Sequence, residues 1–150
     1  MLFRSSVERL ISLARETGRW DDPVVQNKIM RLWAQEQIRG WTNARVRAAL
    51  SAGQSPGAAS SIGKVHQATL NQQIQDLMVD LLGTAAVAWP ATDDEDSLPR
   101  DVRGWMRSLA NGTEGGTTDI NKNILGERVL GLPKEPDPWK GKPWKEIPRS

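Results

Sequence analysis

The sequence predicts an all-α fold similar to a four-helix bundle, with two long antiparallel helices and an extended C-terminal tail. Apolar residues recur at three- and four-residue intervals in several segments, a spacing that places them on one face of a helix. No segment shows sustained two-residue alternation between turns, so no β-strand is predicted. Glycines and prolines separate the periodic segments and mark where one helix ends and the next begins.

The length of the chain, 150 residues, is that of one domain, which buries about two-thirds of the surface of its unfolded chain. We expect the helical domain to occupy residues 1–132. Residues 133–150 are rich in proline and lysine and carry Trp139 and Trp144. This composition favours an extended tail over an element of the core.

End signals predict the first two helices. The first spans Ser5–Arg15, and Gly18 follows it at the C-terminal end. The acidic pair Asp21-Asp22 caps the second, which we expect over Pro23–Leu50 because proline is tolerated in a first turn. The positions expected to face the core are Val7, Leu10, Ile11 and Ala14 in the first helix, and Val25, Ile29, Leu32, Trp33, Trp41, Ala44 and Ala48 in the second.

The third helix is predicted over Ser60–Leu82, and the fourth begins at Pro99 or Arg100. The turn at residues 53–57 is short, which makes the second and third helices antiparallel neighbours. The expected inward positions are Ile62, Val65, Thr69, Ile74, Leu77 and Leu81 in the third helix, and Val102, Trp105, Met106 and Leu109 in the fourth.

A glycine-rich turn leads into the last predicted helix. Gly115 and Gly116 permit backbone angles that other residues avoid, and Thr117 is a favourable N-cap. The helix ends by Gly131, before Leu132-Pro133. A junction of this kind presents unpaired N–H groups and the positive end of a helix dipole, which suits an anion such as phosphate. The same pattern also describes a capped helix with no ligand.

Composition narrows the class of function. The formal net charge of +2 argues against a dedicated nucleic-acid binder, although the Lys/Trp tail leaves this open as a minor alternative. The chain has no cysteine, which suits a reducing cytoplasm. No apolar run approaches a membrane span, and the N-terminus lacks the apolar core of a signal peptide.

No metal site is predicted. His66 is the only histidine, and without cysteine it has no obvious co-ligands. The acidic run at residues 93–96 lacks the alternation and terminal glutamate of a calcium loop, so we interpret it as a solvated loop.

The glycine-rich turn and the helix after it resemble a known family. Residues 115–133, GGTTDINKNILGERVLGLP, are similar to the GGT…ERVLGLP signature near the end of acyl-CoA dehydrogenases, especially divergent bacterial members. The resemblance implies that Gly116, Thr117 and Asp119 lie against FAD. In many members a glutamate precedes the Gly-Thr pair and removes the α-proton of the acyl-CoA thioester, but Gly115 stands at that position here. Glu114 lies one residue too early to be assumed a replacement, so no catalytic residue is assigned.

Other segments resemble the same family, whose C-terminal domain is a helical bundle. Residues 58–83 look like its [AS]-S-x-x-K…D-L-x-G helix, with Ser61 and Lys64 at the recognisable positions. Arg15 falls near an arginine that in the family reaches the FAD pyrophosphate across a subunit interface. Gly83–Ala86 correspond to a glycine loop that meets the adenine of the neighbouring subunit's FAD, and one glycine remains here.

The resemblance covers only the last third of a complete acyl-CoA dehydrogenase, without its N-terminal and β-domains. One hypothesis is that the chain is the C-terminal domain of a flavin-dependent enzyme that carries out α,β-dehydrogenation of an acyl-CoA. The missing domains would then bind the acyl-CoA. The other is a non-catalytic helical assembly module that has kept the fold and lost the active site. Under either hypothesis we expect a homo-oligomer or a partner chain that carries the missing domains, and the chain alone should be inactive.

Overall fold

The computed structural model describes residues 6–55, 59–88, 97–134 and 136–148, and every regular element within them is helical. The all-α prediction is therefore confirmed. The elements are α1 (Ser6–Glu16), α2 (Pro23–Ser51), α3 (Ala59–Leu82), η1 (Gly83–Ala86), α4 (Arg100–Leu109), η3 (Ala110–Gly112), α5 (Thr118–Arg128) and η4 (Trp144–Glu146), where η marks a 3₁₀-helix.

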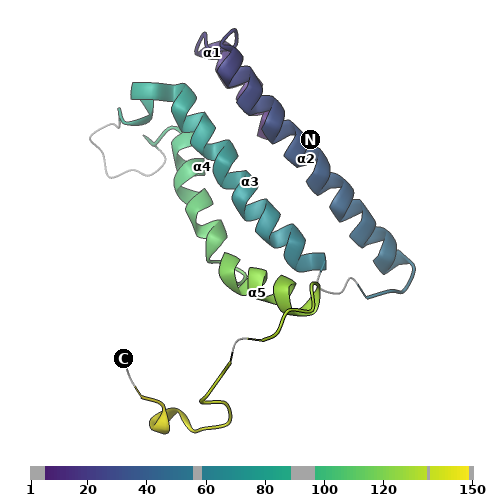
Figure 1. Ribbon diagram of the computed structural model, residues 1–150. Helices are drawn as coiled ribbons and strands as arrows, with labels where there is room; N and C mark the ends of the chain where they lie inside the picture. Colours follow the sequence, from purple (N-terminus) through teal and green to yellow (C-terminus); the bar gives the residue numbers. More distant parts are fainter. Residues whose placement is uncertain (1–5, 56–58, 89–96, 135, 149–150) are drawn as a thin grey trace.

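The two long helices, α2 and α3, lie side by side and antiparallel, as the short turn between them predicts (Figure 1). Helix α3 is central: it contacts α1 and α2 as well as α4 and α5. Beyond α5 the tail leaves the bundle (Figure 1), and among its described residues η4 is the one regular element. The division between domain and tail at residues 132 and 133 stays a prediction.

Local signals set the helix ends. The Oδ1 atom of Asp22 accepts a hydrogen bond of 2.8 Å from the N–H of Val24, and Pro23 occupies the first turn of α2. Gly18 ends the segment after α1 with a φ of +71°, a left-handed conformation that favours glycine. These caps confirm the predicted boundaries to within about one residue.

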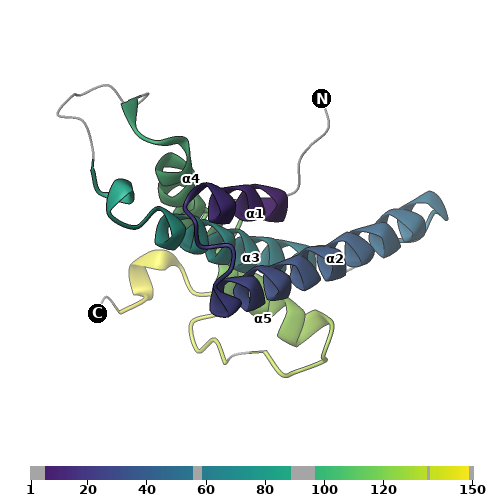
Figure 2. The ribbon, with the colours of Figure 1, turned by 90° about the horizontal axis from the view of Figure 1, so that it is seen from above.

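The core lies where α1 packs on α2 and α3. Its buried members are Val7, Leu10, Leu13, Ala14, Val25, Ile29, Leu32, Leu70, Ile74, Leu77, Met78 and Leu81. The members from α2 come from its first ten residues, and those from α3 all lie at Leu70 or later. Figure 2 shows the reason: the C-terminal half of α2 extends well past α1.

Several positions predicted to face the core are exposed instead. On α2, Trp33 and Trp41 are 46% and 66% exposed, and Ala44 and Ala48 are exposed as well. On α3 and α4 the same holds for Ile62, Thr69, Met106 and Leu109. On α2 the prediction was wrong because α1, with 11 residues, covers only part of α2, with 29. An apolar helical face is buried only where another element lies against it.

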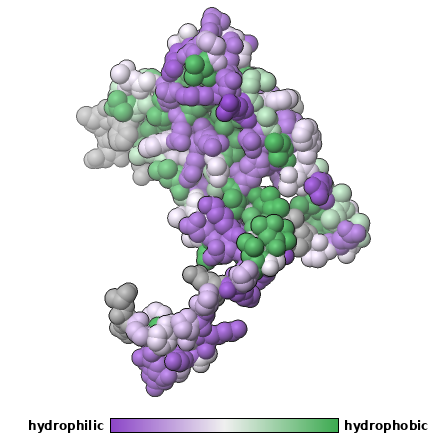
Figure 3. All heavy atoms as spheres, in the orientation of Figure 1, coloured by the Kyte–Doolittle hydropathy of each residue, from purple (hydrophilic) through white to green (hydrophobic). Residues whose placement is uncertain are grey.

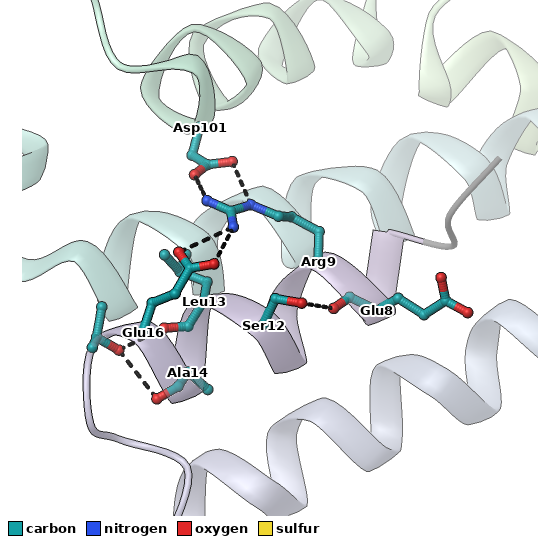
Figure 4. A network of polar contacts seen from close by, with 8 residues as sticks. Glu8, Arg9, Ser12, Leu13, Ala14, Glu16 and Asp101 are labelled. Atoms are coloured by element: carbon teal, nitrogen blue, oxygen red, sulfur yellow. Dashed lines mark hydrogen bonds and ion pairs between the residues drawn. The ribbon is translucent and has the colours of Figure 1, made fainter. Parts of the chain in front are cut away.

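An ion pair joins α1 to α4 at the edge of the core (Figure 4). Arg9 Nη2 donates to Asp101 Oδ2 at 2.6 Å, and Arg9 Nη1 donates to Glu16 Oε1 at 3.0 Å. The hydrogen bond to Asp101 raises the pKa of Arg9 above its ordinary value. The partners are 92 residues apart in sequence, so no local pattern could have predicted this contact.

The predicted acidic loop at residues 93–96 lies outside the described residues. Among the helices that are described, none combines the length and apolar character needed to cross a membrane.

We expect Leu10→Ala to lower the free energy of unfolding by about 2–5 kcal/mol, because it leaves a cavity in a packed core. The side chain of Leu10 is 0% exposed and lies in the cluster that joins α1 to α2 and α3. Leu109→Ala is the matched control, since Leu109 is 53% exposed, and its effect should stay within about 0.5 kcal/mol. Urea unfolding followed by circular dichroism measures both, and equal losses would contradict this account of the core.

Candidate functional site

The candidate site is the turn between α4 and α5. Gly115 and Gly116 have φ angles of +63° and +93°, conformations that strain any residue with a Cβ atom. Before them, the N–H groups of Thr113 and Glu114 both donate to the carbonyl of Ala110. The chain therefore closes one 3₁₀ turn and then reverses through the glycine pair; the sequence predicted the glycine turn but not the 3₁₀ turn before it.

Thr117 caps α5 as expected. Its Oγ1 atom accepts a hydrogen bond of 3.1 Å from the N–H of Ile120. The N–H groups of Thr118 and Asp119, in the first turn of α5, have no carbonyl one turn earlier in the helix to bond. With the helix dipole they make a positive pole at the surface. The exposed Thr117 stands directly before this pole.

Asn121 holds the turn from the side of α5. This residue is 8% exposed, and its Nδ2 atom donates to the carbonyls of Gly116 and Thr117 at 3.2 and 2.9 Å. A Cβ atom at Gly116 would lie 3.1 Å from that same nitrogen. Glycine is thus favoured at this position by the close contact with Asn121 as well as by its φ angle.

Asp119 is on the surface, with its side chain 89% exposed and 3.6 Å from the ammonium group of Lys122. An i,i+3 pair of this exposure contributes little to stability. Its carboxylate is therefore accessible to a partner or a ligand beside the turn.

Glu114 is engaged in a second contact network. Arg107 Nη2 donates to its Oε2 atom at 2.6 Å, and Asn111 Nδ2 donates to its Oε1 atom at 2.6 Å. The hydrogen bond from Arg107 is the main reason that the pKa of Glu114 lies below its ordinary value. A carboxylate whose pKa is lowered in this way is a poor general base, which agrees with leaving Glu114 unassigned.

Arg15 does not join the turn within one chain. Helix α1 ends near Asp80, whose carbonyl accepts a 3.0 Å hydrogen bond from Arg19, whereas the turn lies near Lys64. Sixteen residues of α3 separate these two points, about 24 Å at 1.5 Å per residue. Arg15 is exposed, with its guanidinium carbon 5.1 Å from the ring centroid of Trp20. The segment Gly83–Ala86 follows α3 at the same end as Arg15 (Figure 1).

His66 is bonded to a neighbouring helix and has no metal-binding surroundings. Its Nε2 atom lies 2.9 Å from Gln35 Oε1 on α2. Across the described part of the chain, no three His, Cys, Asp or Glu residues gather as a potential metal site.

The contacts of Lys64, Asn71 and Asn111 with the turn were missed by sequence reasoning. Lys64 Nζ donates to the carbonyl of Asn111 at 2.9 Å, and Asn71 Nδ2 donates to Asn111 Oδ1 at 2.6 Å. The sequence separations are 47 and 40 residues. The only available signal was that Lys64 stands in the segment that resembles the family helix.

Comparison with known proteins places these features in a family. The model of the acyl-CoA dehydrogenase C-terminal domain matches residues 1–130. The chain belongs to the acyl-CoA dehydrogenase family. Its match to the C-terminal domain of that family confirms the resemblance of the turn and of α3.

Two curated relatives carry the name acyl-CoA dehydrogenase IpdE1. The protein from Mycobacterium tuberculosis is 26% identical over 136 residues, which cover 90% of this chain and 34% of the relative. The protein from Mycolicibacterium smegmatis is 28% identical over 127 residues, covering 84% and 30%. The chain therefore spans about a third of the length of these acyl-CoA dehydrogenases.

Solved structures share the fold. The Tcur3481–Tcur3483 steroid ACAD gives a TM-score of 0.71 at 18% identity, over 86% of this chain and 34% of that one. The ChsE4–ChsE5 complex from Mycobacterium tuberculosis gives 0.64 at 24% identity, over 86% and 37%. At these identities the likeness establishes the helical arrangement alone.

We expect Arg107→Ala to raise the pKa of Glu114 toward its ordinary value of 4.5, because the bond from Arg107 is the largest cause of its lowering. A lowered pKa means that ionised Glu114 favours the folded state above about pH 4.5. That contribution is lost as the pH falls through the pKa of the folded protein, and it should shrink in the variant. A carboxyl NMR titration measures the change. Arg100→Ala, at the other end of α4, is the control, and an equal shift there would contradict the assignment.

Proposed function

We propose that this chain is the C-terminal helical domain of a flavin-dependent acyl-CoA dehydrogenase, and that it contributes to FAD binding and to subunit assembly. The observation that carries the proposal is the capped glycine turn, which stands within the segment that matches the family domain. The whole enzyme would need the N-terminal and β-domains, supplied by the same protein or by a partner chain, to bind the acyl-CoA.

The residues of the turn fit a flavin cofactor by their chemistry. An exposed hydroxyl, two first-turn N–H groups and a positive helix pole gather at Thr117–Asp119, and together they can donate hydrogen bonds to a polar, anionic molecule. The glycines before them add no side chain that would block close approach. Bound FAD would supply the acceptor for the hydride that leaves the β-carbon of the acyl-CoA. Thr117 and Asp119 would hold and orient that acceptor.

We propose that Arg15 and Gly83–Ala86, at the other end of α3, also contribute to FAD binding. The family resemblance assigns them to the FAD of a neighbouring subunit, and their position about 24 Å along α3 from the turn is compatible with a second cofactor. Under this proposal one chain contacts two flavins, one at each end of its central helix.

The second candidate function is a non-catalytic assembly module. Gly115 offers no base, and Glu114 is bonded to Arg107 and Asn111. If the chain takes part in dehydrogenation, the carboxylate that removes the α-proton must come from another segment or chain. The two candidates differ in whether the assembled protein retains FAD.

Exposed apolar residues support the assembly role. Met30, Trp33 and Trp41 share one side of α2 at 100° per residue, and they are 56%, 46% and 66% exposed. Figure 3 shows further apolar surface near the end of the bundle from which the tail departs. The exposed apolar residues of α5 and the turn after it are Ile120, Val129, Leu130 and Leu132. The ChsE4–ChsE5 structure is a complex, and we propose a partner chain or a second copy here as well.

We expect Thr117→Val to weaken FAD binding about tenfold in the assembled enzyme, the loss typical of one well-placed hydrogen bond. The test is equilibrium dialysis of FAD against the chain combined with its β-domain-bearing segment or partner. Thr117→Ser keeps the hydroxyl and should bind like the original protein. Thr113→Val, which removes a hydroxyl bonded only to Ala110, is the matched control.

The outcomes separate the two functions. An assembled protein that retains no FAD would reject the flavin role and leave the assembly module. Stoichiometric flavin on the isolated chain would also overturn the scheme, because the groups that hold the flavin ring are expected in the β-domain.

We expect the chain to form a homo-oligomer or a stable complex, and Trp41→Ala to weaken it, because large exposed aromatics on one helix side are typical interface anchors. Light scattering over about a hundredfold dilution measures the association. Trp144→Ala is the control, since Trp144 is 75% exposed but lies in the tail. A monomer at all concentrations, with or without the partner and in both variants, would show that the apolar side of α2 needs no cover.

A further inference from the structure

The glycine turn has little apolar packing of its own. Glu114, Gly115, Gly116 and Thr117 are all exposed, and two successive glycines give the backbone more freedom than any other pair of residues. Fixing such a segment costs conformational entropy that only specific contacts can offset. Polar contacts from outside the turn must therefore hold it in place.

Lys64 supplies the first of these contacts from α3. Its ammonium group donates to the carbonyl of Asn111, 2.9 Å away, just before the turn. Its stem runs beside the turn as well, because a Cβ atom built on Gly115 would lie 3.8 Å from Lys64 Cε and 3.9 Å from Nζ. The positive charge of Lys64 also contributes to lowering the pKa of Glu114, after the bonds from Arg107 and Asn111.

Asn111 extends the network in both directions. Its Oδ1 atom accepts from Asn71 Nδ2 at 2.6 Å, and its Nδ2 atom donates to Glu114 Oε1 at 2.6 Å. Asn71 lies seven residues after Lys64, which places both on the same side of α3. Helix α3 thus holds Asn111 at two points, and Asn111 in turn holds the first residue of the turn.

We propose that Lys64 and Asn111 are positioning residues that fix the glycine turn on α3 so that Thr117 and the first N–H groups of α5 meet the cofactor. This inference rests on the proposed function. Neither residue needs to touch FAD: Lys64 acts through the carbonyl of Asn111, and Asn111 acts through Glu114. Asn121 fixes the other side of the turn, so the flavin-facing segment is held from α3 and from α5.

The first test uses the 150-residue chain without cofactor. We expect Lys64→Met to lower the backbone ¹⁵N order parameters of Gly115–Thr117 from about 0.85, the rigid value, toward about 0.6. Asn111→Asp should have a similar effect, because it replaces the donor to Glu114 with a like charge. Lys64→Arg keeps a cationic donor and should restore most of the order. Lys28→Met is the matched control, since Lys28 pairs with Asp80 at 3.6 Å at the other end of α3.

The second test measures FAD affinity in the assembled enzyme by equilibrium dialysis. Lys64→Met should weaken binding about tenfold, because a turn that is no longer fixed must be ordered when FAD binds, while the control and Lys64→Arg stay close to the original. Unchanged order parameters in both Lys64→Met and Asn111→Asp would overturn the positioning role even if the original enzyme binds FAD. An original enzyme that binds no FAD would overturn the proposed function, while the order parameters would still report whether the network fixes the turn. Loss of order with unchanged FAD affinity would show that the cofactor does not depend on this turn.

Discussion

Burial of α3 on two sides is the constraint on which the rest of the structure depends. From Leu70 onward it packs with α1 and the beginning of α2 to form the main apolar core. Its other side carries α4 and α5, so the same helix sets the position of the glycine turn. Because a helix of 24 residues spans about 36 Å, α3 also fixes the distance between the two ends at which candidate cofactor residues lie.

The contacts of α3 change character along its length. Near Asp80 the helix is held by apolar packing and by surface ion pairs with Arg19 and Lys28. Near Lys64 it is held to the turn by hydrogen bonds from long polar side chains. Apolar contacts tolerate small shifts, whereas hydrogen bonds require close distances and directions. The polar end is therefore the one suited to holding a backbone turn in a defined place.

Features that depend on neighbouring residues, such as helix caps and turns, were predicted from the sequence. Asp22 and Thr117 cap the helices they were expected to cap, and the glycines before Thr117 adopt the expected left-handed angles. These features depend on neighbours within a few residues. The match of residues 1–130 to the family domain confirmed the resemblance that the turn first indicated.

Features that depend on distant segments were not predictable in the same way. Trp41 has the same helical spacing as a core residue, but it is exposed, because α1 is too short to cover the C-terminal half of α2 (Figure 2). Asp101 meets Arg9 across 92 residues, and Lys64 meets Asn111 across 47. The spacing of apolar residues in a sequence shows that one face of a helix is apolar, but it does not show which other element packs against that face. Ion pairs between distant residues are harder still to predict, because charged residues are found on the solvent-exposed side of most helices.

The backbone conformation at residue 115 limits which side chain the turn can carry. At Gly115 the φ angle of +63° favours glycine and disfavours glutamate. Glycine at this position therefore avoids strain, and the cap at Thr117 and the network of Asn111 do not depend on a side chain there. The fold and the turn therefore need no carboxylate at residue 115, because the cap, the glycine pair and the contacts from α3 are enough to hold them.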